Sequence, residues 1–201
     1  MAKRNVLIVF AHLDSQTSFN GALKDKAVQI LSSQGYSVSI SDLYVQNFDP
    51  RESKDINKGD VTDEQDKLRQ ADLVIFQFPL YWSSVPAILK GWFDRVLEKG
   101  VIYNLPDEIF EKGFMRGKKA LLSFTTGESG EHFTSIGKVD MKVLIWHILW
   151  GTLGFVGFDV PNPQVFYAPA LKQDKERQKM IDDWAARLQH IFNEEPMSFS
   201  S

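Results

Sequence analysis

Residues 71–82 have the sequence ADLVIFQFPLYW, and the mainly apolar run from Leu73 to Phe78, closed by Pro79, decides the fold. A strand of this kind is buried on both faces, as it is when helices cover both sides of a parallel sheet. Val6–Phe10 and Ala120–Phe124 are two further runs of the same character. Longer segments with apolar residues at helical spacing separate these runs. The sequence therefore predicts an α/β fold.

The remaining segments extend this alternation. A half-buried strand is expected at 36–43, and a last strand is expected within 155–166. One helix is expected to start with a capping box formed by Thr62 and Gln65. Helices are expected at 18–33, 62–69, 86–98, 138–153 and 172–192.

Five strands separated by helices favour a doubly wound parallel sheet of order 2-1-3-4-5. The 201 residues fit a single domain, 1–201. A loosely ordered C-terminal tail is expected from about residue 194 to 201, where Pro196 and several serines gather.

Composition excludes several classes of function. The net charge of −3 provides no basic surface for nucleic acid or for membranes. The chain has no cysteine, which excludes disulfides, a thiol nucleophile and cysteine metal sites. The run Val6–Phe10 is too short for a signal peptide or a membrane span, so a cytoplasmic protein is expected.

Ligands of doubly wound sheets bind where strands end, and three loops are expected to meet there. The first, 11–21, carries hydroxyl and amide side chains at a helix start, which suits a phosphate but equally an ordinary helix cap by Thr17 or Ser18. The second, 78–86, places Tyr81 and Trp82 between two prolines; they form either a wall for a flat conjugated ring or part of the core. The third, 125–130, is small and hydroxyl-rich and fits either a ligand or a surface loop.

Long stretches of the chain resemble the NAD(P)H:quinone oxidoreductases, a family with a flavodoxin-like fold. The resemblance runs from Val6 to about Pro196. It rests on residues 71–82 continued by 85–96, and on 18–20, 41–44, 125–127 and 193–196.

The resemblance implies an oxidoreductase with non-covalently bound FAD, acting as a homodimer with two active sites at the subunit interface. NADH, NADPH or dihydronicotinamide riboside would donate hydride to the flavin, and a quinone would then replace the spent donor in a ping-pong cycle.

The family's binding positions carry over residue by residue. The diphosphate positions are His12, Ser18, Phe19 and Asn20. The positions along the flavin ring are Pro79, Leu80, Tyr81 and Trp82, and those at its polar edge are Thr125, Thr126, Gly127 and Glu128. The positions near the adenylate half are Asp174 and Arg177. The acceptor pocket comprises Trp82, Ser83, His132 and Phe155, with Tyr103 and Leu105 contributed by the partner subunit.

The chain also departs from the family pattern. Glu128 replaces a glycine, and Phe133 replaces a tyrosine that stabilises charge on the reduced ring. The family's catalytic histidine falls at Val139 or in a one-residue gap, which leaves the adjacent His132 as a candidate or as a solvent-facing loop histidine. The segment before the second helix is shortened to about 55–63.

A further departure concerns metal. One branch of the family binds a metal through two histidines and a cysteine. The matching histidine positions hold Trp150 and Gly154, and no cysteine is present, so no metal is expected.

Two alternatives to a quinone reductase remain from other classes. One is a flavin-binding regulatory or interaction protein with weak reductase activity, which Phe133 keeps open. The other is an electron-transfer flavodoxin, which the FAD positions Asp174 and Arg177 disfavour. A surplus of aromatic residues supports the homodimer; these residues are Trp92, Phe93, Tyr103, Trp146 and Trp150.

Overall fold

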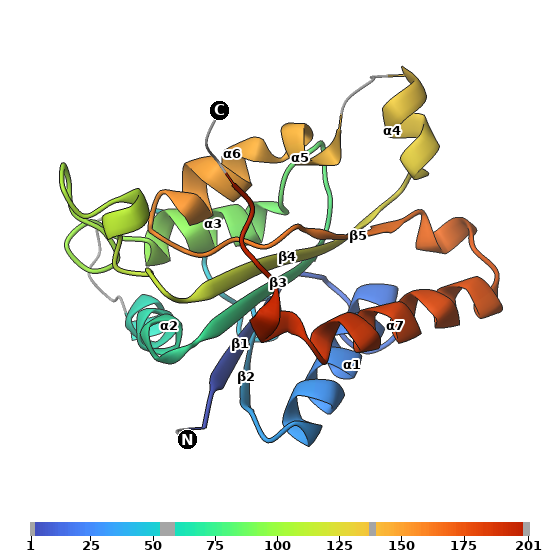
Figure 1. The fold of residues 1–201 in the computed structure, drawn as a ribbon, viewed down its shortest axis with the longest axis horizontal. Helices are drawn as coiled ribbons and strands as arrows, with labels where there is room; N and C mark the ends of the chain where they lie inside the picture. Colours follow the sequence, from blue (N-terminus) through green and yellow to red (C-terminus); the bar gives the residue numbers. More distant parts are fainter. Residues whose placement is uncertain (1–2, 53–58, 137–139, 199–201) are drawn as a thin grey trace.

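The computed structural model describes residues 3–52, 59–136 and 140–198. Five parallel strands form one sheet in the order β2-β1-β3-β4-β5, which confirms the predicted topology (Figure 1). The strands are β1 (Asn5–Phe10), β2 (Ser37–Asp42), β3 (Leu73–Pro79), β4 (Lys119–Thr126) and β5 (Gln164–Tyr167).

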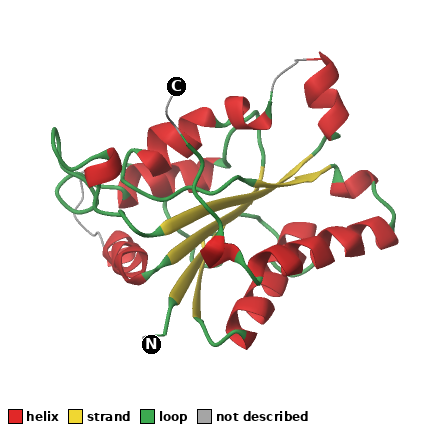
Figure 2. Cartoon of the chain, viewed as in Figure 1, coloured by secondary structure: helices red, strands yellow, loops and turns green. Residues whose placement is uncertain are grey.

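Helices cover both faces of the sheet (Figure 2). On one side lie α1 (Phe19–Ser33) and α7 (Asp174–Leu188), which pack against each other. On the other side lie α2 (Gly59–Gln70), α3 (Ala87–Val96), α5 (Met141–Leu144) and α6 (Trp146–Ile148). A separate short helix, α4 (Gly130–Ile136), follows the end of β4.

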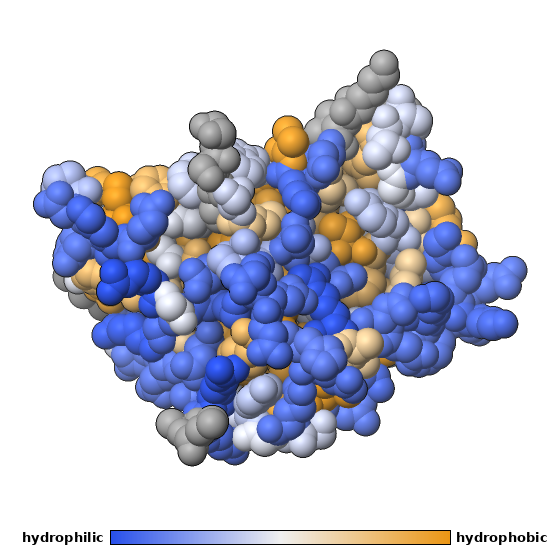
Figure 3. All heavy atoms as spheres, viewed as in Figure 1, coloured by the Kyte–Doolittle hydropathy of each residue, from blue (hydrophilic) through white to orange (hydrophobic). Residues whose placement is uncertain are grey.

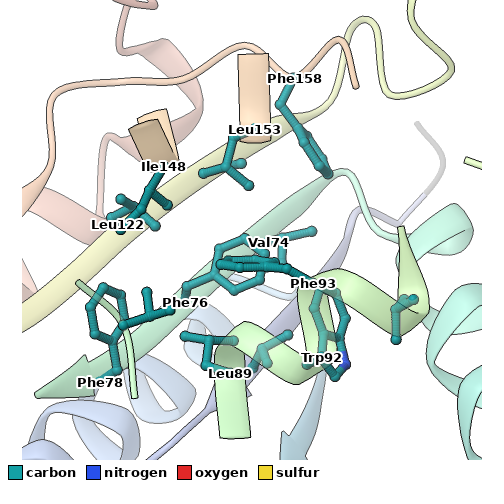
Figure 4. Packing of buried hydrophobic residues seen from close by; sticks show 14 of the residues in the cluster. Val74, Phe76, Phe78, Leu89, Trp92, Phe93, Leu122, Ile148, Leu153 and Phe158 are labelled. Carbon is teal, nitrogen blue, oxygen red and sulfur yellow. The ribbon is translucent and has the colours of Figure 1, made fainter. Parts of the chain in front are cut away.

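Alternating side chains along the central strands divide the core into two layers. Val74, Phe76 and Phe78 of β3 face the layer of α3 and α6, where aromatic and branched side chains fill the space (Figure 4). Leu73 and Ile75 face α1 and α7. Burial on both faces explains why β3 is apolar at nearly every position.

Local sequence fixes both ends of α1. The Ser18 hydroxyl accepts a hydrogen bond from Gly21 N (3.0 Å) and caps the start of the helix. Gly35, with φ of +85°, ends it in the left-handed region that favours glycine. A side chain at Gly21 would collide with the carbonyl oxygen of Ser15, so this glycine lets the preceding loop fold back against the helix.

Two of the predicted helices differ from those observed. α2 already includes Gly59, so Thr62 and Gln65 lie inside it and form no capping box; Gln65 instead donates to the Val96 carbonyl (3.2 Å). The helix expected at 138–153 is divided into α5, α6 and a π-helical turn, Leu149–Gly154. Of the shortened 55–63 segment, residues 55–58 lie outside the described residues, as does Val139.

The edge strands also differ from the expectation. β5 is paired only from Gln164, after Pro161 and Pro163, because proline has no N–H to donate to the ladder. In β2, Ile40 is 39% exposed while Ser41 is buried, so apolar alternation did not identify the buried face of this strand.

The end of the chain is held against the body as far as Met197. Met197 N donates to the Val160 carbonyl (2.8 Å), and Lys119 Nζ donates to the Glu194 carbonyl (2.6 Å). The Glu194 carboxylate also pairs with Arg187 (2.7 Å). These contacts differ from the loose tail expected from residue 194 onward.

Candidate active site

The three loops singled out in the sequence meet at the carboxyl edge of the sheet. Strand register places Gln77 beside both Phe10 and Ser123, and it places Pro79 beside Thr125. Two backbone bonds continue the alignment past the strand ends: Ala11 N to the Gln77 carbonyl (3.0 Å) and Leu80 N to the Thr125 carbonyl (2.8 Å). Parallel pairing of β1, β3 and β4 thus creates one crevice.

The first loop folds around its own carboxylate. Asp14 accepts from the backbone N–H of Gln16 (2.9 Å) and of Thr17 (2.8 Å), and also from the Thr17 hydroxyl. That hydroxyl, followed by the two backbone N–H groups, lowers the pKa of Asp14 to about 2. His12 Nδ1 lies 3.0 Å from Asp14 N and therefore supports the loop from inside. The loop is ordered by its own contacts.

The start of α1 remains suited to an anion. Helix geometry leaves the first-turn N–H groups of Phe19 and Asn20 without intrahelical acceptors. The first turn carries no acidic residue, and a helix N-terminus favours negative charge. Ser18 is the cap as well as a neighbour of these N–H groups, so the two alternative roles of this loop are compatible.

The second loop holds Trp82 in a strained turn. Tyr81 N donates to the Ser84 carbonyl (2.9 Å) and Ser84 N donates to the Tyr81 carbonyl (3.0 Å). Trp82 and Ser83 between them have φ of 47° and 60°, which costs about 1–2 kcal/mol per non-glycine residue. Trp82 is 101% exposed, so it is not part of the core of this chain. Backbone strain at a residue whose side chain is fully exposed is typical of a binding site.

The third loop combines buried hydroxyls with open space. Thr125 and Thr126 are buried, and Thr126 donates to the Glu128 carbonyl (2.7 Å). A side chain at Gly127 would meet nothing within 4 Å, so the crevice is open at this point. Glu128 itself is exposed and lies 3.8 Å from His132 Nδ1.

Two site residues lie on strands and were missed from the sequence. Gln77 is 1% exposed and Ser123 is 0% exposed, and both connect through hydrogen bonds to Asn20 and Thr125. The available signal was a polar side chain inside each apolar run, Gln77 in β3 and Ser123 in β4.

A phenol lies beside the residue that replaces the family's tyrosine. The ring of Tyr167, at the end of β5, is 6.2 Å from the ring of Phe133, centroid to centroid. Burial, followed by the charge of Asp140, raises the pKa of Tyr167. His132 is exposed and its ring lies 6.1 Å from that of Phe133. A position-by-position comparison with the family could not reveal that Tyr167 lies beside Phe133, because Tyr167 belongs to a different segment of the chain.

The other predicted pocket residues, Tyr103, Leu105 and Phe155, lie away from the carboxyl edge of the sheet. α3 runs back from the carboxyl edge, so the loop between α3 and β4 lies near the amino edge of the sheet (Figure 1). Tyr103 and Leu105 belong to this loop. The rings of Tyr103 and Phe155 are 5.4 Å apart. Phe155 therefore belongs with Tyr103 and not, as expected, with Trp82 and His132 of the same chain.

Aromatic rings continue outward from this pair. Phe110 contacts Phe155 (5.4 Å) and stacks on Trp150 (4.5 Å), which in turn lies 6.3 Å from Trp146. Trp146 is 42% exposed and Leu105 is also exposed. We call this set the aromatic corner; its members are Tyr103, Phe110, Trp146, Trp150 and Phe155.

Trp92 and Phe93 are not part of an exposed aromatic surface. Both are buried within this chain against Phe76 (Figure 4), and Trp92 Nε1 donates to Glu64 (2.8 Å). Their expected part in an interface was wrong, because α3 directs them into its own core.

Asp174 and Arg177 form an ion pair in the first turn of α7, where Arg177 also donates to the Lys172 carbonyl. Ala168 N, just after β5, donates to the Thr126 carbonyl (3.1 Å), so the segment leading to α7 departs from the third loop. The ion pair thus lies on the same side of the sheet as α1.

Among the described residues, no three histidine or acidic side chains are grouped closely enough to hold a metal ion. Within the same residues, no helix has both the length and the apolar character needed to cross a membrane. In the space-filling view, apolar patches lie scattered among mainly polar side chains (Figure 3).

Comparisons with known proteins agree with this geometry. The family described as having a flavodoxin-like fold matches residues 4–188. Human ribosyldihydronicotinamide dehydrogenase [quinone] is 47% identical over 98% of this chain and 96% of its own. The chain belongs to the quinone-reductase family of flavodoxin-like proteins.

Two further quinone-reductase relatives cover nearly the whole chain. Rat NAD(P)H dehydrogenase [quinone] 1 is 41% identical over 100% of this chain and 82% of its own. The crystal structure of a candidate quinone reductase from Klebsiella pneumoniae matches with a TM-score of 0.89 and 30% identity, covering 98% of this chain and 88% of that one.

Proposed function

We propose that this protein is a FAD-dependent quinone reductase that takes electrons from a reduced nicotinamide. The observation that carries the proposal is the crevice at the carboxyl edge of the sheet. There the N-terminus of α1, the exposed indole of Trp82 and the buried Thr125 and Thr126 come together in a chain of the quinone-reductase family.

The residues present fit a flavin dinucleotide. The N–H groups of Phe19 and Asn20 and the Ser18 cap suit the diphosphate, with His12 supporting the loop. Open space at Gly127 admits a flat ring against the backbone. The ring positions are Pro79, Leu80, Tyr81 and Trp82 on one side and Thr125, Thr126 and Glu128 at the polar edge. Asp174 and Arg177 would hold the adenylate half, which favours FAD over the shorter FMN.

When bound, FAD would supply a two-electron carrier between the nicotinamide donor and the quinone. The protein's own part is to orient ring and substrate and to place hydrogen-bond donors where charge increases on reduction. We assign that part to the Thr125 hydroxyl, which accepts from Asn20 (2.9 Å), and to the phenol of Tyr167, whose ring lies 6.2 Å from that of Phe133. Trp82 provides the flat apolar face over which a quinone or nicotinamide would stack, with Ser83 beside it.

The acceptor pocket would be completed by a second copy of the chain. One chain carries Trp82, Ser83 and His132 at the carboxyl edge, and it carries Tyr103, Leu105 and Phe155 at the amino edge. In a symmetric dimer, the aromatic corner of each subunit would cover the Trp82 turn of the other. Phe155 would then enter the pocket together with Tyr103, from the partner subunit.

Phe133 supports a second candidate, a flavin-binding interaction protein with weak reductase activity. A phenylalanine cannot donate to the reduced ring, so loss of this hydroxyl could leave binding intact and turnover slow.

One experiment separates the two candidates. Purified protein should contain one FAD per chain, and NADH, NADPH or dihydronicotinamide riboside should bleach its visible absorption, with a quinone restoring it within the dead time of manual mixing. FMN in place of FAD would contradict the cofactor assignment. Bleaching that takes many minutes with every donor would favour the interaction protein.

A further inference from the structure

Four polar side chains form a hydrogen-bonded chain inside the sheet. Ser123 Oγ donates to Gln77 Oε1 (2.7 Å), Gln77 Nε2 donates to Asn20 Oδ1 (2.8 Å), and Asn20 Nδ2 donates to Thr125 Oγ1 (2.9 Å). All four residues are buried, and they come from β4, β3, α1 and the end of β4. The series of hydrogen bonds therefore begins in the buried interior and ends at the crevice.

The direction of donation is fixed at the inner end. If both amides were turned over, Gln77 would donate to Ser123, and the fully buried Ser123 hydroxyl would lose Gln77 Oε1, the acceptor of its 2.7 Å hydrogen bond. Leaving a buried donor unsatisfied costs about 1–3 kcal/mol. The alternative direction is therefore disfavoured, and each member donates toward the crevice.

The outer end consequently has a proton to give. Thr125 Oγ1 accepts from Asn20, so its own proton is directed away from the network. The adjacent Thr126 differs, because its hydroxyl donates within the loop to the Glu128 carbonyl (2.7 Å). Of the two neighbouring threonines, only Thr125 retains a proton for a ligand.

We propose that Ser123, Gln77 and Asn20 act as a one-way relay that makes Thr125 a hydrogen-bond donor to the polar edge of the flavin. Gln77 and Ser123 are positioning residues in this scheme, which rests on the proposed function. Donors in such a chain polarise one another. A donor aimed at atoms that gain negative charge on reduction stabilises the reduced cofactor more than the oxidised one.

A purely structural role explains this network poorly. Replacing both partners of a buried hydrogen bond by apolar side chains of similar shape can be nearly neutral or stabilising, so stability alone does not require a polar network here. β3 is buried at all seven positions, and six of its residues are apolar, so the amide of Gln77 is an exception in its own strand.

The test measures the two-electron midpoint potential of bound FAD and the FAD dissociation constant in Ser123→Ala and Gln77→Met. We expect the ratio of reduced to oxidised affinity to fall about fivefold in Ser123→Ala and about tenfold in Gln77→Met, which corresponds to a potential lower by about 20–30 mV. Ser41→Ala is the matched control, because Ser41 is an equally buried serine whose hydroxyl donates to Glu64 (2.8 Å) on the far edge strand. It should lower thermal stability without changing the potential.

Thr125→Val provides an independent check by removing the end of the relay. In that background, adding Ser123→Ala should produce no further change in potential, whereas a general packing defect would add to it. Unchanged potentials in both relay variants, with FAD bound, would overturn the relay and leave the proposed function standing. A parent protein that takes up no FAD would overturn the proposed function instead. If Gln77→Met does not fold, Ser123→Ala alone decides.

Discussion

The two ends of the sheet differ in the kind of side chains that they present. The carboxyl edge is built from small, hydroxyl and amide side chains whose hydrogen bonds are largely satisfied within the chain, including Asp14 in its loop and Gln77 in its strand. The aromatic corner is the reverse, since its rings continue from Tyr103 and Phe155 near the amino edge to an exposed Trp146. Trp146 precedes His147, whose Nε2 lies 3.3 Å from Ser84 Oγ in the Trp82 turn. The loops of the carboxyl edge are ordered by contacts within one chain, whereas the aromatic corner and the exposed Trp82 present apolar surface of the kind that marks an interaction site. From this difference we expect cofactor binding and dimerisation to respond to different substitutions.

Removal of one ring from the aromatic corner should weaken the homodimer, and this is the largest effect that we expect. We expect Trp146→Ala to weaken the homodimer at least 30-fold, about 2 kcal/mol, because large aromatics dominate interface energies. Quinone turnover at micromolar concentration should fall with the dimer while FAD stays bound. Sedimentation velocity measures the association, and Leu171→Ala, another exposed apolar truncation, is the control. An unchanged dimer in Trp146→Ala would place the interface elsewhere.

A side chain at Gly21 should damage only the carboxyl edge. Gly21→Ala forces its Cβ into the Ser15 carbonyl, and overpacking of this kind costs about 1–3 kcal/mol. FAD affinity should therefore fall about 10- to 100-fold, as measured by quenching of flavin fluorescence, with no change in dimerisation. Gly151→Ala also enters open space, but in the π-helical turn Leu149–Gly154 away from the proposed cofactor loops, and it is the matched control. Equal FAD affinity in Gly21→Ala and the parent would show that the first loop does not contact the cofactor.

Exchange of one hydroxyl tests the chemistry of the crevice. Tyr167→Phe should slow reduction of bound FAD by up to about tenfold, the scale of a single hydrogen bond of about 1.4 kcal/mol. Phe133→Tyr should speed the same step, and His132→Ala should slow it less than tenfold. Stopped-flow bleaching of the FAD band measures all three rates. A slower or unchanged rate in Phe133→Tyr, with FAD bound, would mean that this site lacks no hydroxyl.

The smallest effect concerns acid. Because the pKa of Asp14 is lowered from 3.8 to about 2, its contribution to loop order is complete above pH 3.8 and is lost as pH falls toward 2. Protection of the Gln16 and Thr17 amides from hydrogen exchange, measured by mass spectrometry after acid pulses, should be lost within that window, so that their exchange approaches the intrinsic rate at each pH. Asp14→Asn should have a less protected loop at neutral pH and no such transition. A transition of equal size in both proteins would assign it to other carboxylates.

The pattern of apolar residues made the sheet predictable. Short, wholly apolar runs such as Val6–Phe10 are readily assigned to buried strands in a chain where strands and helices alternate. Helix ends were harder. Thr62 and Gln65 match a capping box by type, yet tertiary packing extends α2 backward and directs Gln65 to Val96.

Loop positions in the site also followed from the sequence, because parallel strands bring their carboxyl ends together. What the sequence could not provide was contact between distant segments. Tyr167 beside Phe133, and Phe155 beside Tyr103, are neighbours only after the chain has folded.

The edges of the sheet have a consequence for aggregation. β5 offers only four paired residues after two prolines, and β2 carries polar residues at four of its six positions, SVSISD. Short or polar edge strands are poor templates for pairing with another chain. Copies of this protein are thereby discouraged from joining sheet to sheet into open-ended fibres, and contact between side-chain surfaces is left as the route by which they can meet.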